Sequence, residues 1–341
     1  MINELFATFT DEPFLRFNFF KDGKPLENSP FCAMSVRSAG SMRFRWNELN
    51  SNRDVFLEKI AKSVTPVPVE LIHSRIVYDV KEAGQTSGLQ GDGIITTNKS
   101  LMPVVTVADC MPIYLYEPES GVFGIVHSGW KGTGIIEDAI KLAFKTYGDR
   151  DEWKIGKNGD RDEWKNGDRD KSFSGGENAG GRGDRVCGGE HVGENFCVIL
   201  GPHIRNCCYI VNQERADYFS DNFGSDCVTP LEDGGKCYCG GRGLAINWNN
   251  GSDGGKLYRL SLEKANLNVL KRCGVKEENI VVYKDCTCCE ERLGSNRRET
   301  ALFQAEQTEL AKKAAAREGC GEDIKKQPAP FTVQAAFIKY M

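Results

Sequence analysis

The stretch MPVVTVADCMPIYLYE, residues 102–117, decides the fold because it is almost continuously apolar and rich in β-branched and aromatic residues. A short run of this composition predicts a strand buried on both faces. Other runs of similar character, bounded by Gly, Pro or Asn, also predict strands. These are residues 31–48, 69–80 (VELIHSRIVYDV), 93–97, 121–129 (GVFGIVHSG), 196–200, 279–283 and 331–341.

Helical segments alternate with these strands. In residues 135–147, Ile136, Ile140 and Ala143 recur at helical spacing, and acidic residues occupy the first turn, where the helix dipole favours them. Apolar spacing or helix-forming composition predicts further helices over residues 52–61, 212–223, 257–272 and 301–317. The chain is therefore expected to be one α+β domain over residues 1–341, a layered sandwich with a mixed β-sheet core flanked by helices.

Three stretches interrupt the pattern and are predicted to be long surface insertions. Residues 148–193 are polar and repeat NGDRDEWK at 158–165 nearly as GDRDEWK at 148–154. Residues 232–255 form a Gly- and Cys-rich loop, and residues 299–330 carry a helical insert that ends near Pro328 and Pro330.

The composition favours a cytoplasmic protein. A formal charge of −4 gives no general electrostatic reason to bind nucleic acid or an anionic membrane. No apolar run reaches membrane-spanning length, and the first twenty residues lack the basic and apolar regions of a signal peptide. We therefore expect neither nucleic acid nor membrane as a partner.

Fourteen cysteines without a signal peptide are expected to be reduced thiols. Cys207-Cys208, Cys237-x-Cys239 and Cys286-x-Cys288-Cys289 raise the question of a second metal site. They do not make the two C-x-x-C pairs of a zinc knuckle, so packing roles are favoured. If a second metal is bound, Cys237 and Cys239 are the first candidates.

The clearest functional signal is the trio His73, Cys110 and His127, each of which closes an apolar run. One thiolate and two imidazoles make the ligand set of a catalytic zinc site whose fourth position is open. Taken singly, a buried Cys or His is more often a packing residue. Asp109, next to Cys110, could orient a ligand or move protons, or could serve as a capping carboxylate.

These residues lie within motifs that resemble the laccase-domain family. The motifs, in order, are LIHSRIV (71–77), GDGIITT (91–97), TVADCMPIYLY (106–116), GIVHSGWKGTG (124–134), LGPHIRNCCYIV (200–211), DCT (285–287) and SNRR (295–298). Members of this family were once called polyphenol oxidases and are now understood as zinc-dependent purine nucleoside phosphorylases with adenosine deaminase activity. The ADC and HSGWKG segments are its most specific parts.

The resemblance implies Zn²⁺ held by His73, Cys110 and His127, with Cys110, His127 and Asp109 in the catalytic site. Phosphate is expected to bind Arg37, Lys131, Arg297 and Arg298, because cationic side chains suit phosphate and all four lie in matching segments. The expected partners are nucleosides (adenosine, inosine, guanosine or methylthioadenosine) and phosphate. A homo-oligomer is compatible with the sequence.

Three other functions stay open at this point. A multinuclear copper oxidase is disfavoured, because four histidines cannot supply its ligands. A metal-free cysteine hydrolase could use Cys110 as nucleophile and His127 as base. A non-catalytic interaction protein could retain the fold and bind partners through its insertions.

Overall fold

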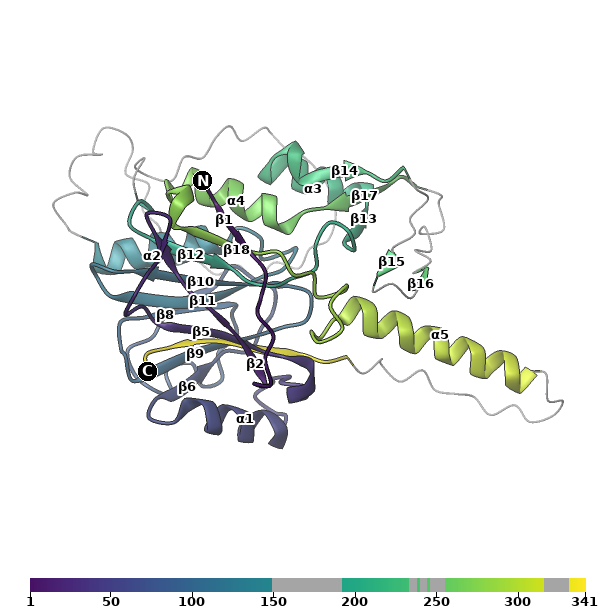
Figure 1. The fold of residues 1–341 in the computed structure, drawn as a ribbon, viewed down its shortest axis with the longest axis horizontal. Helices are drawn as coiled ribbons and strands as arrows, with labels where there is room; N and C mark the ends of the chain where they lie inside the picture. The colour runs from purple at the N-terminus through teal and green to yellow at the C-terminus, as the bar shows by residue number, and fades with distance from the viewer. Residues whose placement is uncertain (149–191, 233–237, 240–243, 246–254, 316–330) are drawn as a thin grey trace.

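Two β-sheets packed face to face, each covered by helices on its outer side, form the body of the protein (Figure 1). The computed structural model describes residues 1–148, 192–232, 238–239, 244–245, 255–315 and 331–341. Helices α2 and α4 lie over the larger sheet, α3 packs beside α4, and α1 lies under the smaller sheet (Figure 1). This layered α+β architecture confirms the fold class expected from the sequence.

The larger sheet has seven strands in mixed orientation, with β10, β11 and β12 at its centre. Strands β10 and β11 are antiparallel, whereas β12 and β18 are parallel. In spatial order its strands are β1 (Asn3–Leu5), β18 (Ile280–Tyr283), β12 (Cys197–Leu200), β10 (Met111–Glu117), β11 (Val122–Ser128), β8 (Gly93–Thr96) and β7 (Val77–Asp79).

The smaller sheet has five strands, and its centre is the C-terminal strand β19, which pairs antiparallel with both β5 and β9. Its spatial order is β2 (Phe14–Phe17), β5 (Phe31–Ser35), β19 (Gln334–Lys339), β9 (Leu101–Val107) and β6 (Thr65–Pro68). A third sheet has three strands, in the order β13 (Ile210–Asn212), β17 (Leu257–Leu260) and β14 (Val228–Pro230). Two short pairs complete the described strands: β3 (Phe20–Lys21) with β4 (Lys24–Pro25), and β15 (Tyr238–Cys239) with β16 (Leu244–Ala245).

The apolar stretch 102–117 was predicted as one strand, and this prediction is wrong in one respect. The stretch forms β9 in the smaller sheet and β10 in the larger sheet, joined by a corner at residues 108–110. At this corner Asp109 has φ +81°, a left-handed conformation that ends a strand. The corner carries the chain from the smaller sheet to the larger one and places Cys110 directly before β10.

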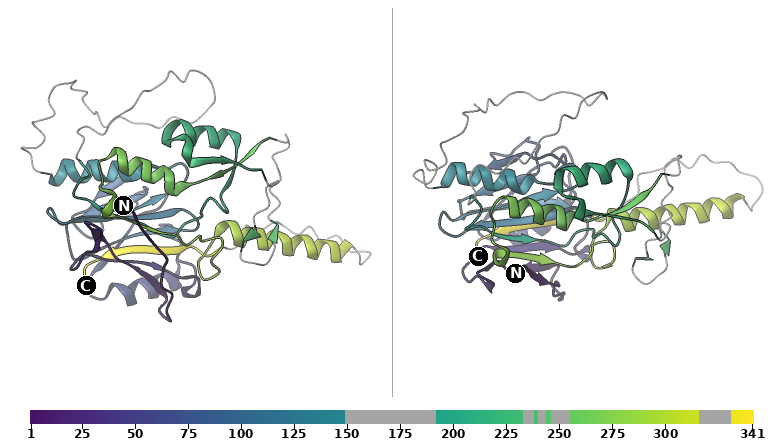
Figure 2. Two further views of the ribbon diagram at one scale, coloured as in Figure 1. Left: turned by 45° about the horizontal axis from the view of Figure 1, so that its top comes forward. Right: turned by 90° about the horizontal axis from the view of Figure 1, so that it is seen from above.

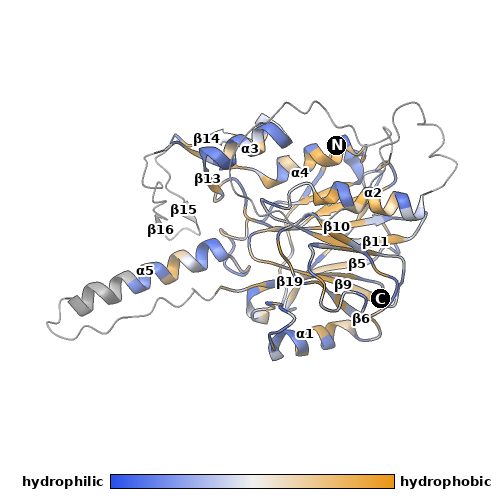
Figure 3. Ribbon diagram, turned by 180° about the vertical axis from the view of Figure 1, so that it is seen from behind, coloured by the Kyte–Doolittle hydropathy of each residue, from blue (hydrophilic) through white to orange (hydrophobic). Residues whose placement is uncertain are grey.

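The strands are apolar on both faces because both sheets are covered on both sides. Ile113 and Leu115 of β10 face the helices, whereas Tyr114 packs between the sheets against Phe17, with ring centroids 5.6 Å apart. In β19, Phe337 faces α1 and Ile338 faces the larger sheet. Figure 3 shows the same distribution, with apolar colour concentrated on the strands and on the inner sides of the helices.

The helices agree with the sequence prediction except at two places. Residues 257–272 divide into strand β17 and helix α4 (Leu262–Arg272), because the Ser261 side chain accepts a hydrogen bond from the Lys264 amide and so caps a new helix. Helix α5 (Asn296–Ala315) begins earlier than expected, so SNRR lies in its first turn, and it extends away from the body (Figure 2). The other helices are α1 (Ser51–Ala61), α2 (Ile135–Tyr147) and α3 (Gln213–Phe223).

The predicted insertions 148–193 and 232–255 fall largely outside the described residues. Of the third, 299–330, residues 299–315 belong to helix α5, which agrees with a helical insert, and residues 316–330 lie outside the described residues. The roles of all three stay predictions. Among the described helices, none has both the length and the apolar composition that a membrane crossing requires.

Gly124, in the middle of β11, tests how tightly the larger sheet is packed. A Cβ there would lie 2.3 Å from the Ile94 carbonyl oxygen and 2.9 Å from the Ile95 Cα, both of them backbone atoms. We expect Gly124→Ala to lower the free energy of unfolding by about 3 kcal/mol, the upper end of overpacking costs. Gly255→Ala, where no atom of the described residues lies within 4 Å, should change it by less than about 0.5 kcal/mol. Urea titration measures both, and equal midpoints would contradict the prediction.

Candidate metal and nucleoside site

The structure brings His73, Cys110 and His127 together. Their ligand atoms all lie within 4.8 Å of one another, and the two imidazole rings are 4.9 Å apart at nearly a right angle. Cys110 comes from the corner between β9 and β10, and His127 from the end of β11, opposite Pro112 in the strand register. Residues from segments far apart in the sequence therefore meet at the ends of central strands of the larger sheet.

His73 lies on a loop and not at the end of a strand, so the prediction of one strand over 69–80 is wrong. The chain leaves strand β6 at Pro68 and enters β7 at Val77, and His73 is exposed with φ +60°. Such left-handed backbone at a non-glycine residue is uncommon and often marks a functional site. Arg75 fastens the loop to the start of α2 through ion pairs with Glu137 at 3.1 Å and Asp138 at 2.5 Å.

Asp92 holds this arrangement in place, and sequence reasoning missed its role. Its fully buried carboxylate accepts hydrogen bonds from the amides of His73 at 3.0 Å and Ser74 at 2.6 Å, and from the Ser74 hydroxyl at 2.7 Å. It also contacts His127 Nδ1 at 2.9 Å, which leaves His127 Nε2 for the site. The available signal was the GDG motif, which places an acid between glycines just before a buried strand.

The charges of the site suit metal binding. Burial raises the pKa of the Cys110 thiol, but the imidazoles of His127 and His73 outweigh burial and lower this pKa to about 6. Burial lowers the pKa of His127, whereas the Cys110 thiolate and Asp92 raise it to about 10. At neutral pH the site therefore holds a thiolate beside an imidazolium. Binding of a cation would displace the imidazolium proton.

Gly129 leaves room beside the three side chains. A Cβ at this position would lie 2.9 Å from Cys110 Sγ, 3.2 Å from His73 Cδ2 and 3.6 Å from His127 Cε1. Any side chain here would crowd the cluster, which explains why a glycine follows His127-Ser128. The donor set and the space beside it fit a zinc ion with three protein ligands.

Asp109 makes contacts that fit a structural carboxylate. It is buried and accepts hydrogen bonds from the Thr287 hydroxyl at 2.7 Å and from the Arg297 amide, in the first turn of α5, at 2.7 Å. Burial raises the pKa of Asp109. The carboxylate thus caps α5, and a part in proton transfer stays a prediction.

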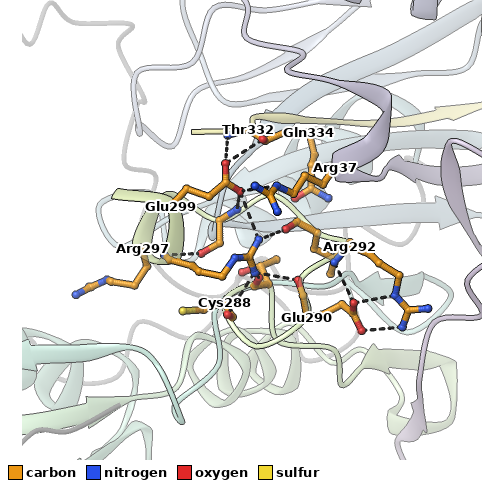
Figure 4. A network of polar contacts seen from close by, with 12 residues as sticks. Arg37, Cys288, Glu290, Arg292, Arg297, Glu299, Thr332 and Gln334 are labelled. Carbon is orange, nitrogen blue, oxygen red and sulfur yellow. Dashed lines mark hydrogen bonds and ion pairs between the residues drawn. The ribbon is translucent and has the colours of Figure 1, made fainter. Parts of the chain in front are cut away.

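Arg298 and Arg37, both expected to bind phosphate, both contact Glu299 at the start of α5. Figure 4 shows Arg37 and Glu299 in this network. The buried Arg298 guanidinium donates to the carbonyls of Thr287 at 2.6 Å and Glu290 at 2.9 Å, and to further carbonyls of the same turn. Arg37 forms an ion pair with Glu299 at 3.6 Å. Through these contacts Arg298 holds residues 287–293 against the start of α5.

Arg297 differs from its neighbour, because its side chain extends away from this network (Figure 4). It lies within electrostatic reach of Tyr209 and Arg215, and Tyr209 is in turn within reach of Cys110. Arg215, which the sequence analysis did not select, stacks 4.3 Å from the Trp130 ring centre. Its Nε atom is buried and has no hydrogen-bond partner within the described residues.

Lys131, the fourth residue expected to bind phosphate, is exposed in the turn after His127, with its ammonium 5.4 Å from the Trp130 ring centre. Trp130 therefore contacts both Lys131 and Arg215. Two arginines, a lysine and two aromatic residues are thus linked to one another, and Tyr209 links this group to Cys110.

The fold and the cluster place the protein in a class of α+β proteins that have two packed sheets. In this class, two histidines and a cysteine near strand ends form a group that can hold a metal ion. The chain belongs to the family described as multi-copper polyphenol oxidoreductase laccase, whose model matches residues 45–154 and 188–303. The matched region contains all three residues of the cluster as well as Asp92.

Curated relatives carry a more specific name. The chain is 25% identical over 235 residues to a purine nucleoside phosphorylase, YlmD, of Geobacillus stearothermophilus, covering 66% of this chain and 63% of that protein. It is 23% identical over 228 residues to a purine nucleoside phosphorylase of Borreliella burgdorferi, covering 67% and 71%. The alignment thus spans less than two thirds of the first relative's length.

Solved structures confirm the fold over nearly the whole chain. The hypothetical protein YfiH of Bacillus licheniformis matches with a TM-score of 0.60 at 18% identity, covering 97% of this chain and 98% of that one. YlmD of Geobacillus stearothermophilus matches with a TM-score of 0.59 at 19% identity, covering 98% of both chains.

Proposed function

We propose that this protein is a zinc-dependent purine nucleoside phosphorylase that acts on adenosine and related nucleosides and also deaminates adenosine. The convergence of His73, Cys110 and His127 within 4.8 Å carries the proposal. Arg215 and Arg297, which are within electrostatic reach of Tyr209 and through it of Cys110, support it. The names of the relatives support it.

In this proposal His73, Cys110 and His127 hold the zinc ion, with Asp92 fixing the tautomer of His127. When bound, zinc supplies Lewis acidity and lowers the pKa of water. The cluster lies between strand ends, where the sheet fixes the backbones of Cys110 and His127.

Phosphorolysis requires that phosphate is held beside the anomeric carbon of the nucleoside. An oxygen of phosphate forms a bond to C1′ as the bond from C1′ to purine N9 breaks, and the purine takes up a proton. Arg297 and Arg215 are suited to bind the phosphate, because guanidinium groups bind its oxygens in pairs and the Arg215 Nε lacks a partner among the described residues. Trp130 offers an aromatic surface for the sugar or base.

Deamination uses the same pocket with water in place of phosphate. A water oxygen adds to C6 of the purine and ammonia leaves, which requires one group to remove a proton from water and to protonate the leaving nitrogen. Asp109 directly precedes Cys110, and we keep it as the candidate for this proton transfer. In this proposal the same carboxylate also caps α5 through the Arg297 amide.

One observation favours a second candidate, a metal-free cysteine hydrolase. The Cys110 thiolate, the His127 imidazolium and the Asp92 carboxylate, 2.9 Å from His127 Nδ1, have the relationship of a nucleophile, a base and an orienting acid. Zinc content separates the two candidates, since a zinc ligand cannot at the same time be a free nucleophile.

The direct test is incubation of the purified full chain with adenosine, with and without phosphate, followed by chromatography of the products. We expect adenine only when phosphate is present and inosine in both cases. Absence of any conversion by zinc-loaded protein would refute the proposed activity, and adenine formed without phosphate would show hydrolysis instead of phosphorolysis.

Replacing the proposed phosphate-binding residues tests the phosphate site separately. Loss of a charged hydrogen bond costs about 1.5–3 kcal/mol, so Arg297→Ala and Arg215→Ala should each raise the KM for phosphate roughly 10- to 100-fold. The rate of deamination should change much less, because it does not use phosphate. Arg272→Ala, which removes an arginine that donates to the Asn222 carbonyl outside the site, is the matched control. An unchanged KM in both site variants would exclude this phosphate site.

A further inference from the structure

A second group of metal-ligating side chains lies outside the nucleoside site. The Sγ atoms of Cys207, Cys208, Cys286 and Cys289 all lie within 4.8 Å of one another. The separations are 3.6 Å for Cys207 to Cys208, 3.7 Å for Cys207 to Cys289 and 3.3 Å for Cys208 to Cys289. We infer that these four cysteines form a structural tetrathiolate site for one zinc ion, independent of the proposed enzymatic activity.

The separations fit one ion of this size. Zinc binds thiolate sulfur at about 2.3 Å, so tetrahedral ligands lie roughly 1.6 times this distance apart, about 3.8 Å. The observed distances approach this value without any rearrangement of the backbone. An iron–sulfur cluster would have to separate its thiolates by the width of the cluster, and tetrahedral sulfur ligands around a single ion favour zinc.

The backbone positions these cysteines on two turns that are joined to each other. The amides of Cys208 and Tyr209 donate to the Arg205 carbonyl at 2.9 and 2.8 Å, and the amide of Cys289 donates to the Cys286 carbonyl at 3.1 Å. A parallel β-bridge between His203 and Cys286 holds the turns side by side. Each turn thus contributes two sulfur atoms, as in structural zinc sites built from two loops.

Cys286-x-x-Cys289 has the spacing of one half of a zinc knuckle, and the adjacent pair Cys207-Cys208 replaces the other half. The sequence analysis gave preference to Cys237 and Cys239. Cys237 lies outside the described residues, and the side chain of Cys239 is likewise not described. Among the described residues, the cysteines that come together are Cys207, Cys208, Cys286 and Cys289.

The surroundings of the cluster suit thiolates, which carry negative charge. The Arg205 amide lies 3.4 Å from Cys286 Sγ in donor geometry, an interaction typical of the groups that support a metal ligand. The Arg259 guanidinium donates to the Cys207 carbonyl at 2.8 Å and brings positive charge to the same turn. Cys207 is exposed, so an ion can reach the cluster from solvent.

This site would stabilise the neighbouring nucleoside pocket through one segment. Thr287, between Cys286 and Cys289, donates to Asp109, which precedes Cys110. Residues 287–293 are also held by Arg298 at the start of α5. A zinc ion on the four cysteines would fix this segment much as a disulfide would, but without an oxidising environment.

Metal analysis of variants tests the inference. We expect about two zinc ions per chain in the wild type, and about one in both Cys110→Ala and the double variant Cys286→Ser/Cys289→Ser. Cys227→Ser is the matched control, because Cys227 is a buried cysteine outside both groups, and it should keep two. A wild type with one zinc ion, lost in Cys110→Ala, would overturn the second site and leave the proposed function intact.

Cobalt substitution provides a measurement that does not depend on the folding of the double variant. Cys110→Ala protein loaded with Co²⁺ should show the intense near-ultraviolet charge-transfer and visible bands of a tetrahedral site with four thiolates. Absence of these bands would overturn the inference. So would mass spectrometry that finds a disulfide among Cys207, Cys208 and Cys289 in protein purified without oxidant and alkylated without reduction.

Discussion

Cys110→Ala is expected to abolish both zinc binding at the nucleoside site and turnover of adenosine. The thiolate is the anionic ligand among the three, so two imidazoles alone would hold the ion more than about 100-fold less tightly, a larger loss than removal of a supporting residue causes. Without the thiolate, the pKa of His127 should also fall, because Cys110 is the first of the groups that raise it. Elemental analysis and product chromatography measure the two losses.

Cys32→Ala is the matched control, because Cys32 is fully buried in the core between the sheets and remote from the cluster. Burial raises the pKa of its thiol, so it remains a neutral packing residue. The control should keep zinc and activity at some cost in stability. If wild-type protein is active without metal and loses activity after alkylation of Cys110, the cysteine hydrolase is the correct function instead.

The sequence was sufficient to select the three residues of the cluster but not the way in which the chain brings them together. Residues 102–117 are almost continuously apolar because both β9 and β10 are buried on both faces, so hydropathy does not reveal that the chain changes sheets at Asp109. The His73 loop was hidden in a similar way, because 69–80 carries several valines and isoleucines, which are typical of a strand. Its conformation depends on Asp92, nineteen residues further along.

Contacts between distant segments account for the other differences. Nothing in the spacing of Cys207-Cys208 and Cys286-x-x-Cys289 indicates that they meet, because a β-bridge between His203 and Cys286 brings them together. Arg215 could not be selected from the sequence for the same reason. It became a candidate for phosphate binding only because its guanidinium packs on the ring of the distant residue Trp130. Periodicity reports local structure and burial, whereas these sites depend on the order of strands in the sheets.

Asp92→Asn is expected to weaken zinc binding by 10- to 100-fold, although residue 92 never contacts the ion. Burial raises the pKa of Asp92, but the hydrogen bonds from His127 and Ser74 outweigh burial and lower it, so the group is a carboxylate at neutral pH. Asparagine has nearly the same volume, and its one oxygen can still accept from the amides of His73 or Ser74. It cannot accept all the hydrogen bonds that two carboxylate oxygens receive.

The Asp92→Asn change should also alter which nitrogen of His127 carries the proton. With asparagine oriented so that its oxygen accepts from the His73 loop, its amide donates toward His127 Nδ1. Nδ1 must then be the unprotonated nitrogen of the neutral ring, so the ring proton stays on Nε2, the atom that must be free to bind zinc. The loss should therefore appear in zinc affinity and in turnover at limiting zinc, and excess zinc should restore part of the activity. Asp79→Asn, which alters a partly buried acid bonded to Tyr147, is the control and should leave zinc affinity unchanged. Equal affinities of wild type and Asp92→Asn would mean that His127 is oriented by the strand alone.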